Sequence, residues 1–205
     1  LPAQVRVLEV LEEAGRLNRM VEGFESNEDL LRRGQENRGL TRPELAILLS
    51  HSKMALQDAA EVSPLGDDPT MAAELLRAFP PQMQERHREA ILGHRLRCEI
   101  VSTKVANRFV NRLGIVAPFA LIEQEGASLG HAAIAFVAAE RLFAMDGLWE
   151  ALDTIGVPEQ VRLELFERAS VALQLHVSDL LRCTTSDMQP GEIVERLQPG
   201  LTKLS

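Results

Sequence analysis

The sequence contains no tyrosine, and only 4% of its 205 residues are aromatic. Runs in which Val, Ile, Thr or aromatic residues alternate with polar ones, the pattern typical of strands, are missing as well. No apolar stretch approaches the ~20 residues that a membrane-spanning helix requires. These absences exclude a β-rich fold and a membrane-dominated chain, and we expect a cytoplasmic all-α protein.

Cysteine is scarce too, since Cys98 and Cys183 lie far apart and neither belongs to a CxxC pair. This spacing provides neither a disulfide framework nor a zinc cluster, so we expect two free thiols. No two of the five histidines are spaced i, i+3 or i, i+4, the spacing that places two metal ligands on one helical face. The sequence therefore predicts no metal site. These histidines are His51, His87, His94, His131 and His176.

Motifs for nucleotide binding and hydrolysis are also missing. A dinucleotide site needs a strand, a GxGxxG turn and a helix in succession, and this combination does not occur. There is likewise no GxxxxGK[ST] phosphate loop and no GxSxG nucleophile elbow. We therefore predict no catalytic residue and no cofactor-binding residue in this chain.

The charge balance is acidic, with 22 Lys and Arg against 30 Asp and Glu and a formal net charge of −8. Such a balance opposes attraction to nucleic-acid phosphates and anionic lipid, so we expect neither a nucleic-acid nor a membrane partner. One alternative is a DNA-binding module, because residues 41–49 resemble the first helix of a helix-turn-helix. The apolar pattern continues through Met54 and Leu56 without the Gly-containing turn, which disfavours that alternative.

The sequence does contain many signals for helix starts and helix ends. Thr41 and Glu44 form a capping box around Pro43, which marks a helix start. Similar signals predict helices over 2–15, 26–34, 41–60, 94–113, 128–145, 158–182 and 192–197, with shorter ones starting at Pro69, Pro81 and Pro118 and one around Trp149. We predict a multi-helix bundle of mostly antiparallel helices without a sheet. It forms one domain over 1–205, or two packed helical subdomains over 1–92 and 93–205.

The helix predicted over 94–113 has two chemically distinct arcs. One arc is apolar and includes Leu96, Val105, Ala106, Phe109, Val110 and Leu113. The other is basic and carries Arg97, Lys104, Arg108 and Arg112, which form either a solvated face or a surface that binds an acidic partner or phosphate. We expect Asn107 and Asn111, four residues apart, to act as a structural polar pair that links helices by buried hydrogen bonds.

The residues from 128 to about 145 are rich in alanine, which allows close approach by other helices and predicts a central position in the bundle. The chain begins with Leu1 rather than Met, and its amphipathic pattern starts almost at once. We therefore expect it to be a piece of a longer protein.

Several blocks in a consistent order are similar to the C-terminal helical region of the bacterial large NAD-specific glutamate dehydrogenases. The likeness covers most of the chain from Leu17 to about residue 182. Its blocks are Gly39 to Ala46, Ser52-Lys53, Leu75 to Pro80, Ile100 to Ile115, Glu125 to Ser128 and Leu148-Trp149.

This resemblance implies a parent enzyme that oxidatively deaminates L-glutamate to 2-oxoglutarate and ammonia and transfers a hydride to NAD. The catalytic residues and the NAD site would lie in a separate domain before this chain, so the chain itself would be inactive. Its implied partners are that catalytic domain and further copies of the parent in a homo-oligomer. Two roles stay open for the chain, namely a scaffold and a regulatory module that senses a small effector.

Overall fold

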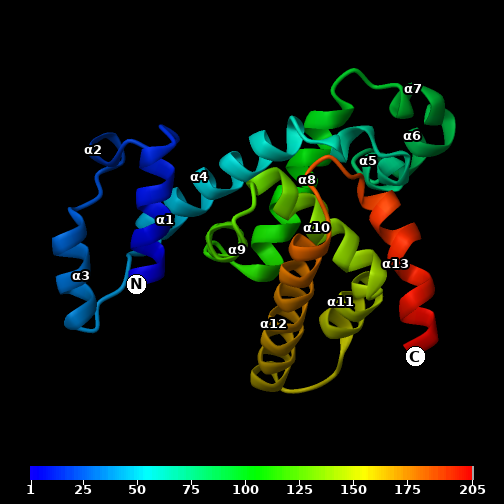
Figure 1. The fold of residues 1–205 in the computed structure, drawn as a ribbon. Coiled ribbons are helices and arrows are strands. Elements are labelled where there is room, and N and C mark those ends of the chain that lie inside the picture. Colours follow the sequence, from blue (N-terminus) through cyan, green and yellow to red (C-terminus); the bar gives the residue numbers. More distant parts are fainter. Residues whose placement is uncertain (205) are drawn as a thin grey trace.

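The structure is a computed structural model that describes residues 1–204, and the side chains of residues 1–203. Within that part of the chain, α-helices and two 3-10 turns are joined by short connections and no strand is present (Figure 1). The predicted all-α class without a sheet is therefore confirmed, while the mostly antiparallel packing stays a prediction.

The helices follow one another along the whole chain. Their bounds are α1 Pro2–Glu13, α2 Arg19–Glu22, α3 Asn27–Gln35, α4 Arg42–Glu61, η1 Pro64–Asp67, η2 Pro69–Met71, α5 Ala72–Leu76, α6 Pro81–Arg86, α7 Arg88–Leu92, α8 Arg97–Leu113, α9 Ala117–Glu125, α10 Leu129–Leu142, α11 Met145–Thr154, α12 Glu159–Cys183 and α13 Pro190–Leu204.

The predicted caps start the helices where the sequence places them. The Thr41 hydroxyl accepts from the Glu44 amide at 3.5 Å, and the Glu44 carboxylate accepts from the Thr41 amide at 2.5 Å. Ser128 caps α10 in the same way, because its hydroxyl accepts from the His131 amide at 3.1 Å. Each cap satisfies an amide that the first helical turn leaves without a partner.

The alanine-rich α10 is the central helix, as predicted. Its alanines are buried, and it packs against α4, α8, α9, α11, α12 and α13, so most of the body surrounds it (Figure 1). Phe136 of α10 stacks on Phe109 of α8 with their ring centroids 4.5 Å apart. The small side chains let neighbouring backbones approach, while the stacked aromatic rings fill the remaining space.

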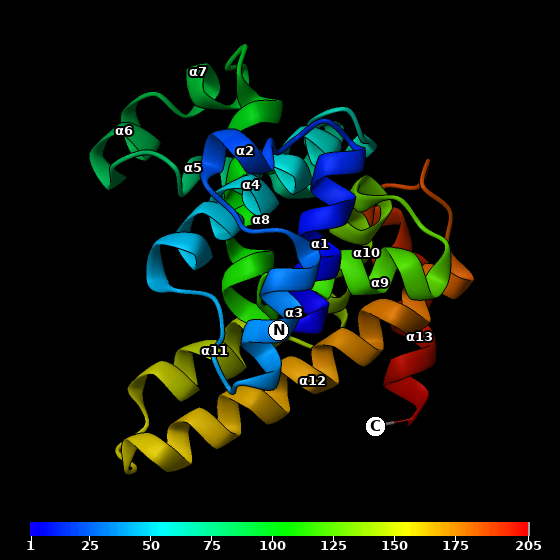
Figure 2. The ribbon, with the colours of Figure 1, turned by 90° about the vertical axis from the view of Figure 1, so that its left-hand side faces the viewer.

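The long helix α4 runs from the α1–α3 end of the molecule, which faces the viewer in Figure 2, to the main body (Figure 1). It contributes residues to two hydrophobic clusters. The smaller cluster joins α1 and α3 to Leu48 of α4 and Phe119 of α9, and the larger one contains Leu56 of α4 with the cores of α8, α10 and α12. Because α4 and α8 share the larger cluster, the core runs across the predicted boundary between 92 and 93. The division into two subdomains stays a prediction.

Three local expectations differ from the structure. The helix predicted from His94 begins at Arg97, because the His94 ring nitrogen Nδ1 accepts from the Leu96 amide at 3.1 Å and holds a turn there. Leu96, expected on the apolar arc, is therefore exposed. The final helix is longer than the predicted 192–197 and continues through Pro199, because Leu201 packs on the core beyond it.

Within the described residues, no single helix has both the length and the apolar composition needed to cross a membrane. Helices α8 and α9 meet these criteria only when they are counted together, across a bend of 91°.

Candidate functional site

The basic arc predicted on residues 94–113 is divided between two places on α8. Lys104, Arg108 and Arg112 are spaced four residues apart and line one surface depression of about 590 Å³, together with Asn107, Asn111 and Glu74. We call the first five of these residues the α8 polar face. Spacing of four residues stacks side chains along one side of a helix, which explains why these residues meet.

Arg97 does not belong to this group. Its guanidinium pairs with Asp67 of η1, and it lines a different depression, of about 310 Å³, near η1 and η2. Arg97 lies seven residues before Lys104, nearly two helical turns away. The structure therefore brings three of the four predicted basic residues together.

Arg112 is held by aromatic rings. The carbon of its guanidinium lies 4.7 Å from the Trp149 ring centroid and 5.3 Å from that of Phe166, while Asp153 approaches one nitrogen at 3.7 Å. Stacking on aromatic faces fixes the guanidinium plane without removing its charge. Arg112 therefore connects α8 to α11 and α12.

Arg108 lies between two carboxylates. Its Nε donates to Glu140 Oε2 of α10 at 2.7 Å, and its Nη1 lies 2.8 Å from Glu74 Oε2 of α5. Glu140 is only 4% exposed, and burial raises its pKa to about 6 even though Arg108 favours the charged form. Arg108 is thus largely committed inside the protein, in contrast to the open basic surface that its helical spacing predicts.

Lys104 carries the least constrained charge of the three. Its ammonium group lies 3.4 Å from the Arg77 carbonyl oxygen, a long contact. No carboxylate pairs with it among the described residues. Lys104 is therefore the most available cation on the α8 polar face.

The two asparagines differ from their predicted role. Both are exposed, and the Asn107 side-chain amide donates to the Thr103 carbonyl of its own helix at 2.9 Å. The apolar arc of α8 is narrower than expected, so these positions lie on its polar side. The expected pair of buried amides is not found in this structure.

Glu74 and Glu140 are the partners that the sequence interpretation missed. Glu140 did leave a signal, because it is the only charged residue between His131 and Arg141 in an otherwise apolar run. A charge on a helix buried on all sides needs a partner, and a basic residue on a neighbouring helix is the natural one. Which basic residue it would be depends on how α8 and α10 pack.

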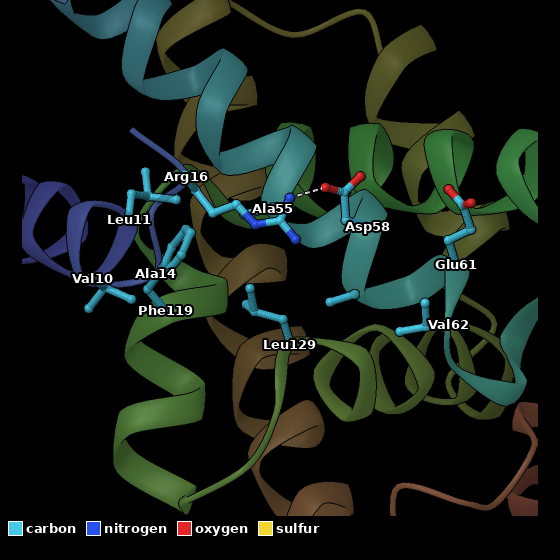
Figure 3. A pocket seen from close by; sticks show the side chains of 11 residues that line it. Val10, Leu11, Ala14, Arg16, Ala55, Asp58, Glu61, Val62, Phe119 and Leu129 are labelled. Atoms are coloured by element: carbon cyan, nitrogen blue, oxygen red, sulfur yellow. Dashed lines mark hydrogen bonds and ion pairs between the residues drawn. The ribbon is translucent and has the colours of Figure 1, made fainter. Parts of the chain in front are cut away.

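A third depression, of about 390 Å³, lies where α1, α4, α9 and α10 meet (Figure 3). Its walls are mostly apolar and include Leu11, Ala55, Phe119 and Leu129, and an ion pair between Arg16 and Asp58 crosses one side. Leu11, Ala55 and Phe119 belong to the smaller hydrophobic cluster, and the depression carries no grouping of polar side chains that resembles a catalytic centre.

The described residues contain no group of three or more His, Cys, Asp or Glu that could hold a metal ion. Cys98 and Cys183 are free thiols. On the α8 polar face, Arg108 and Arg112 pair with carboxylates of other helices, whereas Lys104 has no carboxylate partner among the described residues.

Residues 37–205 match the protein family described as "Glutamate dehydrogenase, C-terminal". The chain belongs to this family. It is 35% identical over 201 residues to the NAD-specific glutamate dehydrogenase of Halomonas elongata, and 34% identical over the same length to that of Pseudomonas aeruginosa. A protein of the same name from Mycobacterium tuberculosis is 32% identical over 158 residues.

These alignments cover 97%, 97% and 77% of this chain but only 12%, 12% and 10% of the three relatives. The chain thus spans about an eighth of the length of the first two. The resemblance to large NAD-specific glutamate dehydrogenases is confirmed, and it extends beyond the blocks that suggested it. The matched family and relatives lend no support to the DNA-binding or effector-sensing alternatives.

Proposed function

We propose that this glutamate dehydrogenase C-terminal chain belongs to a parent enzyme that oxidatively deaminates L-glutamate to 2-oxoglutarate and ammonia. NAD would accept the hydride at a site outside residues 1–205. The observation that carries this proposal is the match of nearly the whole chain to about an eighth of two proteins named NAD-specific glutamate dehydrogenase. We place the parent in the cytoplasm and expect it to form homo-oligomers.

The test compares two purified proteins, the full-length parent and the 205-residue chain, by the absorbance of NADH formed from glutamate and NAD. The parent should reduce NAD only when glutamate is present, and the chain alone should show no turnover. Turnover by the chain alone would refute the assignment of chemistry to another domain, and a parent that is inactive on glutamate would refute the activity.

For the chain itself we propose a scaffolding role, in which residues 1–205 act as one helical domain. Two features support this role. The larger hydrophobic cluster runs from α4 to α13, and the charged groups of α8 are mostly used in contacts between helices. A rigid body of this kind is suited to hold other parts of a chain in position.

The contact surface that we propose is the α8 polar face, which would bind carboxylate-bearing side chains of the catalytic domain in the same parent chain. Lys104 supplies the available charge, and Asn107 and Asn111 supply exposed amides. A polar surface of this kind determines the orientation of two bound domains more than their binding affinity.

Lys104→Glu in the full-length parent tests this surface, with Arg168→Glu as a matched charge reversal on the exposed side of α12. We expect the first change to lower the temperature of thermal inactivation and to speed cleavage between the domains by a protease, and the second to do neither. Equal behaviour of the two variants would place the contact surface elsewhere.

A further inference from the structure

A small cavity of about 110 Å³ lies beside the α8 polar face, between α5, α8, α10 and the start of α11. Six charged residues line it, and they come from these four helices and the residue that follows α5. They are Glu74, Arg77, Arg108, Glu140, Arg141 and Asp146. A polar cavity of this size, enclosed on several sides, can hold a small ligand group or water.

The two oxygens of Glu140 have different surroundings. Oε2 accepts from Arg108, whereas Oε1 is buried without a hydrogen-bond partner among the described residues. Buried carboxylate oxygens normally receive a donor, because an unpaired one loses its hydration without compensation. Glu140 therefore brings an unused acceptor to the wall of a polar cavity.

Two carboxylates at the cavity share a single guanidinium group as their ion-pair partner. Arg108 is shared by Glu74 and Glu140, Arg77 lies 4.0 Å from Asp146, and Arg141 lies 3.8 Å from Asp68. Asp68 does not line the cavity, so the lining holds three carboxylates and three guanidinium groups, but Arg108 alone lies within ion-pair distance of Glu74 and Glu140 among the described residues. Arg141 attracts Glu140 and Glu74 only from a longer distance, because its guanidinium donates to the Thr70 carbonyl at 3.0 Å and also to the Thr70 hydroxyl.

We propose that this cavity binds a primary ammonium group, either the free ammonium ion or the head of a small amine, with Glu140 Oε1 and the Glu74 carboxylate as its acceptors. An ammonium nitrogen supplies a second positive charge beside Glu74 and Glu140, and several N–H donors from one compact centre. The site lies outside any dehydrogenase chemistry, so the proposal does not depend on the parent's activity.

The other occupant that suits this cavity is a trapped water molecule. Water would donate to Oε1 but would leave Arg108 as the shared ion-pair partner of Glu74 and Glu140. At pH 7.5 Glu140 is largely ionised, because its pKa is about 6. The binding of a cation should therefore stabilise the folded chain at this pH, whereas water alone gives no response to added ammonium.

The experiment measures the melting temperature of the 205-residue chain at pH 7.5 and constant ionic strength in four chloride salts. Ammonium and glycinamide are the probes, and potassium and tetramethylammonium are the controls. At a concentration about five times its Kd, a probe that binds in the cavity should raise Tm by about 2–4 °C above the Tm in tetramethylammonium chloride. Stabilisation by ammonium alone identifies the free ion, and stabilisation that includes glycinamide identifies an amine head group.

Two variants locate the effect. Glu140→Gln and Glu74→Gln should each reduce the ammonium-dependent rise at least by half, while Asp58→Asn, which removes a carboxylate at a different depression, should keep it. Because each variant is compared with itself in different salts, a change in its basal stability does not affect the reading. Equal Tm in all four salts, or a full response in Glu140→Gln, would overturn the proposal.

Discussion

Asp68 and Gly191 join two segments 123 residues apart, because the Asp68 carboxylate oxygen Oδ2 accepts from the Gly191 amide at 2.7 Å. The other oxygen, Oδ1, accepts from the Thr70 amide at 2.7 Å and caps η2. A side chain on Gly191 would meet Thr70 Cγ2 at 2.9 Å, so glycine allows this close approach. One buried carboxylate thereby attaches the start of α13 to the segment before α5.

Asp68→Ala should lower the free energy of unfolding by about 2–4 kcal/mol, because it leaves the amides of Thr70 and Gly191 without their acceptor and removes the ion-pair partner of Arg141. Urea denaturation measures this loss, and faster amide hydrogen exchange in α13 locates it. Asp67→Ala is the control, since it removes only an exposed ion pair with Arg97 and should cost under about 1 kcal/mol. Similar losses in both variants would contradict a structural role for the Asp68 carboxylate.

Local chemistry made the helices predictable from the sequence, whereas the contacts between helices were not predictable. The capping box at Thr41 and the alanine run of α10 act within a few residues, so they could be read directly. Met54, which continues the apolar pattern of its helix, is 50% exposed, whereas Ser52 of the same helix is buried. The amphipathic pattern of α4 is weak because two clusters contact it at different angles, and only the packed fold shows which face each cluster covers.

The capping residue Glu44 also binds Arg33 of α3 through both carboxylate oxygens, at 2.9 and 3.0 Å. The hydrogen bonds from Arg33 lower the pKa of Glu44 to about 2, from an ordinary value of 4.5. Its contribution to stability is therefore complete above pH 4.5 and is lost as the pH falls toward 2. Glu44→Gln should cost about 1.5–3 kcal/mol at pH 7.

Urea titrations at several pH values test this prediction. The difference between wild type and Glu44→Gln should shrink as the pH falls from 4.5 to 2. Glu28→Gln, a neutralised carboxylate in the first turn of α3, provides the comparison and should show a much smaller difference. A stability difference between wild type and Glu44→Gln that is independent of pH would show that the carboxylate is not held as an ion pair.

Glu140 has the opposite pH dependence. Burial raises its pKa to about 6, so the folded chain binds this proton more tightly than the unfolded chain, where the pKa is near 4.5. The resulting stabilisation of the folded chain is complete below pH 4.5 and is lost as the pH rises through 6. The free energy of unfolding changes by about 2 kcal/mol, at 1.36 kcal/mol per unit of pKa difference. Glu140→Gln should flatten this part of the stability profile, and an unchanged slope would argue against a buried, titrating Glu140.

The candidate site was predictable in part for the same reason as the fold. The spacing of Lys104, Arg108 and Arg112 follows from helical geometry alone, and these three side chains do share a face. Helical spacing could not show that Glu140 and Glu74 approach Arg108, because those carboxylates come from other helices. It could not show that Arg112 lies over Trp149 either, since that contact depends on where α11 packs.

The approach of α10 to α4 gives a final prediction. A Cβ atom on Gly130 would lie 2.8 Å from the Ala59 carbonyl oxygen, a backbone atom that cannot move aside without shifting α4. Gly130→Ala should therefore reduce the free energy of unfolding by about 1–3 kcal/mol. Gly147 of α11 is the matched control, because a Cβ there meets nothing within 4 Å. Gly147→Ala should stabilise the chain by about 0.5–1 kcal/mol, through helix propensity and a less flexible unfolded state. Thermal and urea unfolding of both variants should thus change in opposite directions, and a common sign would show that helix propensity outweighs the close packing of α10 on α4.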